Sequence, residues 1–180
     1  MVKLDGRITA LAVSAAGAVE VVAVATQTPE NLLMLDGALQ LLQRLPLRDR
    51  TGKLTSPVCN LLVSPQRQSF VAVFSDMPEM WELSYNPLAP EIGLGMVHDF
   101  QYREGHFVPG FLNPLRTALP WNTHAAGLDE GGHMVLLQGP PMSGPGTPLV
   151  IHLDVRKPVR EDVRPETKPQ PCELALNATK

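Results

Sequence analysis

The chain repeats itself at an interval of 50 residues. Leu11–Asp36 (LAVSAAGAVEVVAVATQTPENLLMLD) aligns without a gap with Leu61–Asn86 (LLVSPQRQSFVAVFSDMPEMWELSYN). Each copy has an apolar run ending in Val-Ser, a polar turn, a second apolar run, a turn with proline and a third run. A weaker third copy begins near Gly127 and ends in Leu149–Val155, after a Gly/Pro-rich loop. Such repeats are typical of the blades of a β-propeller.

The repeat predicts an all-β fold, a partial β-propeller of about three four-stranded blades. A closed ring needs at least four blades, so the chain would be a fragment of a longer propeller or close by pairing with a second chain, and of these we expect the fragment. Leu39–Leu45 fits both a strand and a helical period, and within a blade we expect the outer strand. We assign residues 1–157 to the propeller and residues 158–180 to a loose Pro- and charge-rich tail. The predicted strands are Ile8–Ser14, Val19–Ala25, Leu32–Leu35, Val58–Val63, Phe70–Ser75, Met80–Tyr85, His133–Gln138 and Leu149–Val155.

Composition excludes several classes of function. Hydrophobic residues at 44% and charged residues at 18% predict a packed body, and a net charge of −3 gives no footprint for nucleic acid. No apolar run reaches the roughly 18 residues of a membrane span. Charged residues interrupt the first 25 residues, so we expect no signal peptide there. Cys59 and Cys172 are not spaced for zinc, and we expect no disulfide because Cys172 lies in the polar tail.

Candidate functional residues concentrate between Phe74 and Phe111. His98 ends a strand-like apolar run, and a crossing rich in Gly, Pro and aromatic residues follows it. Arg103 lies in this crossing and Arg116 shortly after it. From the residues alone, a hydrogen-bonded structural histidine and solvated arginines are the commoner roles. No histidines have metal-ligand spacing, no hydrolase motif is present, and we assign no catalytic residue.

The ordered series WELSY, VHD, EG and PGFL resembles the haem-d1 propeller family. Its members include the d1 domain of cytochrome cd1 nitrite reductase and proteins that make haem d1. LMLDG in the preceding repeat and VIHLDVRK in the following one are similar to strand ends of the neighbouring blades in that family. The resemblance covers roughly Leu32 to Lys157, and the PGFL segment is most similar to the biosynthetic protein NirF.

The resemblance implies an eight-bladed d1-type propeller that binds haem d1 or its precursor. His98 would contact the macrocycle, and Arg103 and Arg116 would pair with its rim carboxylates. It further implies a periplasmic protein, a late dehydrogenation in haem d1 synthesis, and nitrite reductase or other maturation proteins as partners. Ligation of the iron from the proximal side would come from a part of the propeller upstream of Met1.

Two alternatives stay open beside the biosynthetic role. The first is the d1 domain of a nitrite reductase, which carries a further distal histidine in a strand–turn like Leu61–Phe70. The sequence LVSPQRQSF has no histidine at that place. The second alternative is a non-catalytic propeller that carries haem d1 or holds a partner protein, since one fold serves many functions.

Overall fold

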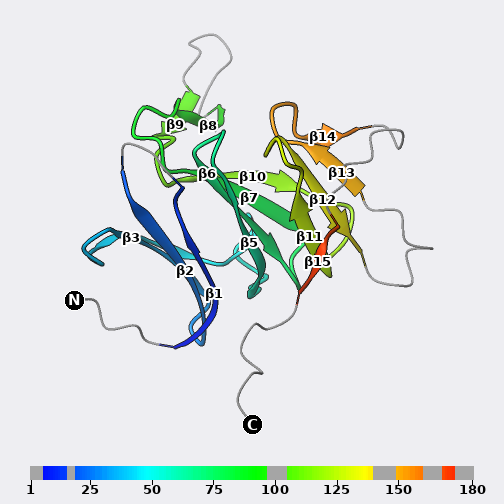
Figure 1. Cartoon of the computed structure of the whole chain (residues 1–180), viewed down its shortest axis with the longest axis horizontal. Coiled ribbons are helices and arrows are strands. Elements are labelled where there is room, and N and C mark those ends of the chain that lie inside the picture. The colour runs from blue at the N-terminus through cyan, green and yellow to red at the C-terminus, as the bar shows by residue number, and fades with distance from the viewer. Residues whose placement is uncertain (1–5, 16–18, 97–104, 140–148, 160–167, 173–180) are drawn as a thin grey trace.

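The structure of this chain, a computed structural model, describes residues 6–15, 19–96, 105–139, 149–159 and 168–172. Regular structure within these residues is entirely β: three antiparallel sheets follow one another along the chain, and a separate two-stranded hairpin accompanies them. The sheets stand side by side as neighbouring blades (Figure 1). The prediction of an all-β chain built from four-stranded units is confirmed. Across the described ranges, no helix has the length and hydropathy to cross a membrane.

The first blade is a simple up-and-down meander. Leu39–Leu45, which fitted two kinds of structure in the sequence, contributes the outer strand of this blade, as expected. The turn before it is set by Asp36, whose Oδ1 accepts hydrogen bonds from the amides of Ala38 and Gln40 at 3.0 and 2.7 Å. The four strands are β1 (Arg7–Val13), β2 (Val21–Gln27), β3 (Asn31–Asp36) and β4 (Leu41–Pro46).

The second blade contains an insertion. Its first three strands follow each other directly, but its fourth strand is reached only after the separate hairpin β8–β9. In Figure 1 this green hairpin stands apart from the strands of the blade. The blade consists of β5 (Val58–Ser64), β6 (Ser69–Phe74), β7 (Glu79–Ser84) and β10 (Pro114–Ala118), and the hairpin of β8 (Ile92–Met96) and β9 (Gly105–Val108).

The third blade gains a fifth strand from the end of the chain. Its strands are β11 (Ala125–Leu128), β12 (Met134–Gln138), β13 (Leu149–His152), β14 (Lys157–Pro158) and β15 (Gln170–Pro171). β15 pairs with β11, the first strand of the blade. The first strands of the three blades contact one another, β1 with β5 and β5 with β11. We call β1, β5 and β11 the inner strands, because β4, β10 and β14 lie at the opposite edges of their sheets.

The repeat in the sequence corresponds to a repeat in the structure, although the pairing of the first two strands differs by two residues between blades one and two. Irregularities in strand pairing fall between Ile8 and Ala10 in β1 and between Val58 and Asn60 in β5, again 50 residues apart. Val13 and Val63 also lie 50 residues apart, but their cross-strand partners Val22 and Phe70 lie 48 apart. The first turn is thus two residues longer in blade one. Because side chains alternate with a period of two, this slip leaves every residue on its proper face.

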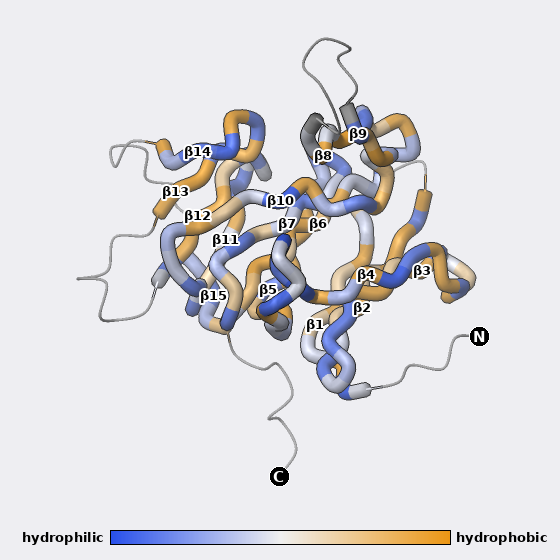
Figure 2. The backbone as a smooth tube through the Cα atoms, turned by 180° about the vertical axis from the view of Figure 1, so that it is seen from behind, coloured by the Kyte–Doolittle hydropathy of each residue, from blue (hydrophilic) through white to orange (hydrophobic). Residues whose placement is uncertain are grey.

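Packing between blades forms two apolar seams, and β6 lies between them with every residue buried. Phe70, Ala72 and Phe74 face blade one, whereas Val71 and Val73 face blade three. A strand covered on both faces reads as a continuous apolar run, which explains the SFVAVF sequence. Figure 2 shows the hydrophobic segments following the strands of all three sheets. The seam partners are Ala23, Ala25, Leu32 and Met34 in blade one and Val135, Leu137 and Ile151 in blade three.

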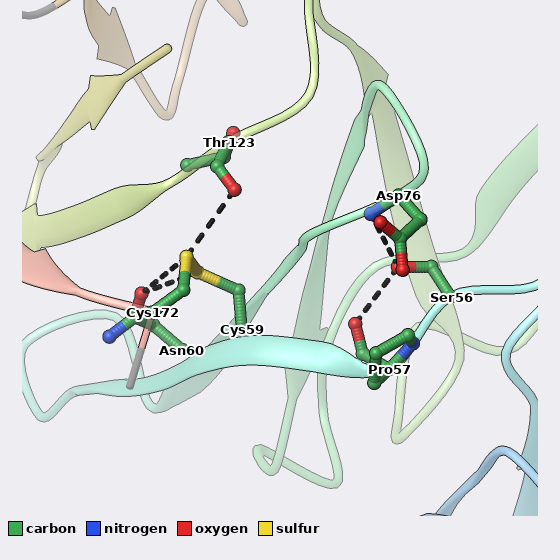
Figure 3. Close-up of a disulfide and its surroundings, with 7 residues drawn as sticks. All are labelled: Ser56, Pro57, Cys59, Asn60, Asp76, Thr123 and Cys172. Atoms are coloured by element: carbon green, nitrogen blue, oxygen red, sulfur yellow. Dashed lines mark hydrogen bonds between the residues drawn. A yellow bond between two sulfur atoms is a disulfide. The ribbon is translucent and has the colours of Figure 1, made fainter. Parts of the chain in front are cut away.

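A disulfide joins Cys59 on the inner strand β5 to Cys172 at the end of β15 (Figure 3). Their Cα atoms lie 4.7 Å apart, within the range that such bonds require. The expectation that these cysteines form no disulfide is therefore wrong. It rested on the polar sequence around Cys172, whereas pairing of β15 with β11 carries this residue back to blade two.

The segment 158–180 is not loose throughout. Pro158 pairs with Ile151 as part of β14, so the predicted boundary after residue 157 falls inside a strand. Gln170 and Pro171 pair with β11, and the amide of Cys172 donates a 2.7 Å hydrogen bond to the carbonyl of His124. The expectation of a loose tail is therefore wrong at Gln170–Cys172.

The seam between the first two blades should dominate stability. Replacing the fully buried Phe74 with alanine should lower the free energy of unfolding by about 3–5 kcal/mol, because the cavity is closed in by two sheets. The matched control is Phe107→Ala, since Phe107 is 56% exposed on the hairpin. Urea unfolding followed by circular dichroism measures both variants. Equal losses of stability in the two variants would contradict the assignment of the core.

Candidate functional site

The predicted site residues fall on and around the insertion in blade two. His98 and Arg103 lie outside the described residues, in the segment 97–104 between β8 and β9 in the sequence. Arg116 is described and lies on β10. The structure therefore defines the base of the hairpin and its surroundings, and the positions of His98 and Arg103 relative to Arg116 stay a prediction.

The base of the insertion is closed by the PGFL segment. Leu112 donates its amide to the carbonyl of Ser84 at 2.7 Å, which ties the returning chain to the end of β7. Gly110 is buried where the two ends of the insertion cross, and a Cβ atom there would overlap the carbonyl oxygen of Pro90. Only glycine permits such a close backbone approach. The glycine of this motif thus has a packing role.

The hairpin itself is apolar and exposed. Strand pairing is irregular between Gly93 and Gly95, and Gly95 has a φ of 122°, which favours glycine. Phe107 pairs with Gly93, where a Cβ atom would lie 3.4 Å from its ring. Leu94 and Phe107 are each 56% exposed. The hairpin therefore presents apolar side chains to solvent on both strands that flank segment 97–104 in the sequence.

Arg116 is held by a cluster at the first seam. Its guanidinium lies 4.2 Å from the centroid of the Trp81 ring and 3.6 Å from Oε2 of Glu79, and it donates a 2.8 Å hydrogen bond to the carbonyl of Arg48. The Trp81 indole also donates to Glu79, at 3.0 Å. Burial lowers the pKa of Arg116, and the positive charge of Arg50 lowers it further. The carboxylate of Glu79 acts in the opposite direction and raises the pKa. Arg116 is thus oriented by fixed partners rather than free in solvent.

A cleft of about 520 Å³ opens between this cluster and the hairpin. We call it the hairpin cleft. Arginines line one part of it and apolar side chains of β8 and β9 another. Its volume lies within the range for small-molecule sites. The lining residues are Asp49, Arg50, Ile92, Gly93, Leu94, Val108, Asn113, Pro114, Leu115 and Arg116.

A second charged cluster, which the sequence reasoning missed, lies at the other face of β7. Glu82 accepts from Nε of Arg67 at 2.8 Å and forms a close ion pair with Arg156 of the third blade. Ser69 donates its hydroxyl to the same carboxylate at 3.0 Å. Arg67 also pairs with Asp154. Glu79 and Glu82 therefore place one buried carboxylate at each seam.

The sequence held one signal for this second cluster. Glu82 stands inside WELSY, between residues that β7 buries, and a carboxylate buried in a central strand requires cationic partners. This requirement could have identified Arg156 as a partner of Glu82 only if the position of the third blade beside the second had been known. Its position in the turn between β13 and β14 is a long-range feature that local sequence does not encode.

The remaining described histidines show no ligand arrangement. His133 and His152 stack with ring centroids 6.4 Å apart, and His152 lies 3.7 Å from Asp154. In the portion of the chain that the structure describes, no three side chains are grouped to hold a metal ion.

Loss of the Glu82 carboxylate should weaken the packing of blade two against blade three. Glu82→Ala should cost about 3–5 kcal/mol of unfolding free energy, because Arg156 and Arg67, both partly buried, lose the carboxylate that they share. Glu130→Ala, at an exposed turn position, is the control and should change little. Chemical denaturation measures both variants. A loss below 1 kcal/mol for Glu82→Ala, on the scale of an exposed ion pair, would contradict this role.

Comparison with known proteins gives two matches of the same kind. No family model matches the chain. A stretch of 74 residues is 40% identical to a dihydro-heme d1 dehydrogenase of Pseudomonas aeruginosa. This match covers 39% of the chain and 15% of the dehydrogenase. The solved structure of the dihydro-heme d1 dehydrogenase NirN in complex with DHE matches 85% of the chain, with a TM-score of 0.63 and 27% sequence identity. The chain spans 27% of that solved chain.

These matches confirm the resemblance to the haem-d1 propeller family that the WELSY–VHD–EG–PGFL series predicted. They point to NirN, and the closer similarity to NirF stays a prediction. In fold, the chain is a partial β-propeller of the d1 type.

Proposed function

We propose that this chain is part of a protein that binds a d1-type tetrapyrrole and oxidises dihydro-haem d1 to haem d1. The observation that carries the proposal is the similarity in both sequence and structure to dihydro-heme d1 dehydrogenases, one of them solved with DHE. The reaction removes two hydrogen atoms from the macrocycle and passes their electrons to a redox carrier. A role nearer to NirF, which the PGFL segment predicts, belongs to the same late stage of haem d1 synthesis.

The hairpin cleft has the chemistry that such a ligand requires. A d1-type tetrapyrrole is a flat apolar plate with carboxylates on its rim, so it needs an apolar wall and cationic groups. Ile92, Leu94 and Val108 supply the wall, and Arg50 and Arg116 supply the cations. Stacking on Trp81 fixes the guanidinium plane of Arg116, which reduces the entropy lost on pairing with a carboxylate.

The histidine and the arginine between β8 and β9 complete the proposed site. His98 would contact the macrocycle, and Arg103 would join Arg116 at the carboxylates. The exposed apolar side chains of Leu94 and Phe107 on the flanking strands support an apolar ligand beside them. These roles follow from the family resemblance and from the position of segment 97–104 in the sequence.

The disulfide supports a periplasmic location. Bonds of this kind persist in oxidising compartments such as the bacterial periplasm and are rare in the cytosol. Cys59 and Cys172 lie 113 residues apart in the sequence, so their pairing depends on the folded chain. In that compartment, nitrite reductase and other haem d1 maturation proteins are the proposed partners. Within the repeat, the absence of a histidine from LVSPQRQSF argues against the nitrite reductase itself.

Titration of the 180-residue chain with haem d1 tests the proposal. We expect saturable changes in the visible spectrum with the wild-type chain and an altered spectrum or weaker binding with His98→Ala. The control is His106→Ala, because His106 is an exposed histidine of the same hairpin. An absence of saturable binding by the folded wild-type chain would contradict a tetrapyrrole site in this part of the protein, and identical titrations of both variants would remove His98 from the site.

The Arg116 side chain allows a second test. Arg116→Gln should weaken haem d1 binding by about tenfold or more, since a hydrogen bond to a charged group is worth about 1.5–3 kcal/mol. The matched control is Arg44→Gln, on the exposed face of β4, and its affinity should not change. Unfolding curves of both variants separate a loss of affinity from a loss of structure. Unchanged affinity of a folded Arg116→Gln variant would mean that residues other than Arg116 bind the rim carboxylates of haem d1.

A further inference from the structure

The end of the described chain is attached to the propeller by very little backbone pairing. β15 is two residues long and aligns Pro171 with Ala125 and Gln170 with Ala126. Because proline has no amide hydrogen, this short strand offers few hydrogen bonds. Cys172 adds one, from its amide to the carbonyl of His124 at 2.7 Å. So short a strand recovers little of the conformational entropy that fixing Gln170–Cys172 costs.

The disulfide attaches the end of β15 covalently to the propeller, and it joins blade three to blade two. Cys172 continues from a strand of blade three, whereas Cys59 lies on the inner strand of blade two. The bond therefore bridges β5 and β15 where the inner strands of two blades contact each other (Figure 3). β15 in turn covers an edge of β11 that would otherwise present unpaired backbone groups.

The surroundings of the disulfide are polar and near the surface. Oδ1 of Asn60 lies 2.8 Å from Sγ of Cys59, and the carbonyl oxygen of Thr123 lies 3.3 Å from Sγ of Cys172. Cys59 is buried, whereas Cys172 is half-buried and both residues of β15 are exposed. A disulfide enclosed in a hydrophobic core resists thiol exchange, but this one is open to attack by a thiolate from the side of Cys172.

We propose that the Cys59–Cys172 disulfide is a thiol-exchange site that latches β15 onto the inner edge of blade three. The co-reactant is a dithiol reductant. Its first thiolate breaks the Sγ–Sγ bond and forms a mixed disulfide, and its second thiol completes the exchange. Two electrons and two protons pass to the chain, Cys59 and Cys172 become thiols, and the reductant becomes a disulfide. Reduction then frees β15 and uncovers the edge of β11.

Hydrogen–deuterium exchange with and without dithiothreitol tests this latch on the 180-residue chain. In the reduced chain, peptides covering β15 and β11 should exchange at least about tenfold faster, as expected for local opening. The peptide covering β6, at the centre of the buried seams, is the internal reference and should keep its protection. The double variant Cys59→Ser, Cys172→Ser should exchange like the reduced chain and should not respond to dithiothreitol.

Two results would overturn the latch. Unchanged exchange of β15 and β11 after complete reduction, verified by thiol alkylation and mass spectrometry, would mean that pairing alone holds the strand. Faster exchange in every peptide, β6 included, would mean that the bond staples the whole fold rather than one strand. Both results are independent of tetrapyrrole binding, so they leave the proposed function to its own titrations.

Discussion

The burial of both faces of the second blade is the interaction on which the rest of this structure depends. A four-stranded sheet with apolar side chains on two faces cannot be stable alone in water, and its neighbours cover one face each. Phe74 and its neighbours meet blade one, and Val73 and its neighbours meet blade three. Every other feature, including the hairpin and the charged clusters, is positioned by this arrangement.

Charges set the geometry that apolar packing leaves open. Hydrophobic contact is not directional, whereas an ion pair in a seam fixes the offset of one blade against the next. Glu82 of blade two contacts Arg156 of blade three across the second seam, whereas the pair of Glu79 with Arg116 lies within blade two. Arg116 also lines the hairpin cleft. The residue proposed to bind a carboxylate is therefore oriented by Trp81 and Glu79 of its own blade and by the carbonyl of Arg48 between β4 and β5, which couples the site to the fold.

Local sequence predicted those parts of the structure that local physics decides. The repeat predicted the blades, because a shift in strand register by two residues keeps the alternation of apolar side chains. Such a shift separates the first two blades, since Val13 pairs with Val22 but Val63 pairs with Phe70. The repeat did not predict β10, since Pro114–Ala118 is a short strand that follows an insertion rather than a turn. The disulfide was missed because the return of Cys172 to β5 is a pairing over 113 residues.

The candidate site was predictable to a similar degree. The sequence reasoning named Arg116 because it flanks the Gly/Pro-rich crossing, but it could not reveal that Trp81 and Glu79 hold this arginine. It also assigned no role to Glu82, whose partners come from a turn and from the next blade. Contacts between repeats depend on how the repeats stack, and that information is spread over the whole core.

A crystal structure of the 180-residue chain with haem d1 tests the central claim most directly. The account predicts the macrocycle against Ile92 and Val108 in the hairpin cleft, with a rim carboxylate within about 3 Å of the Arg116 guanidinium. A macrocycle bound away from both the hairpin and Arg116 would contradict it.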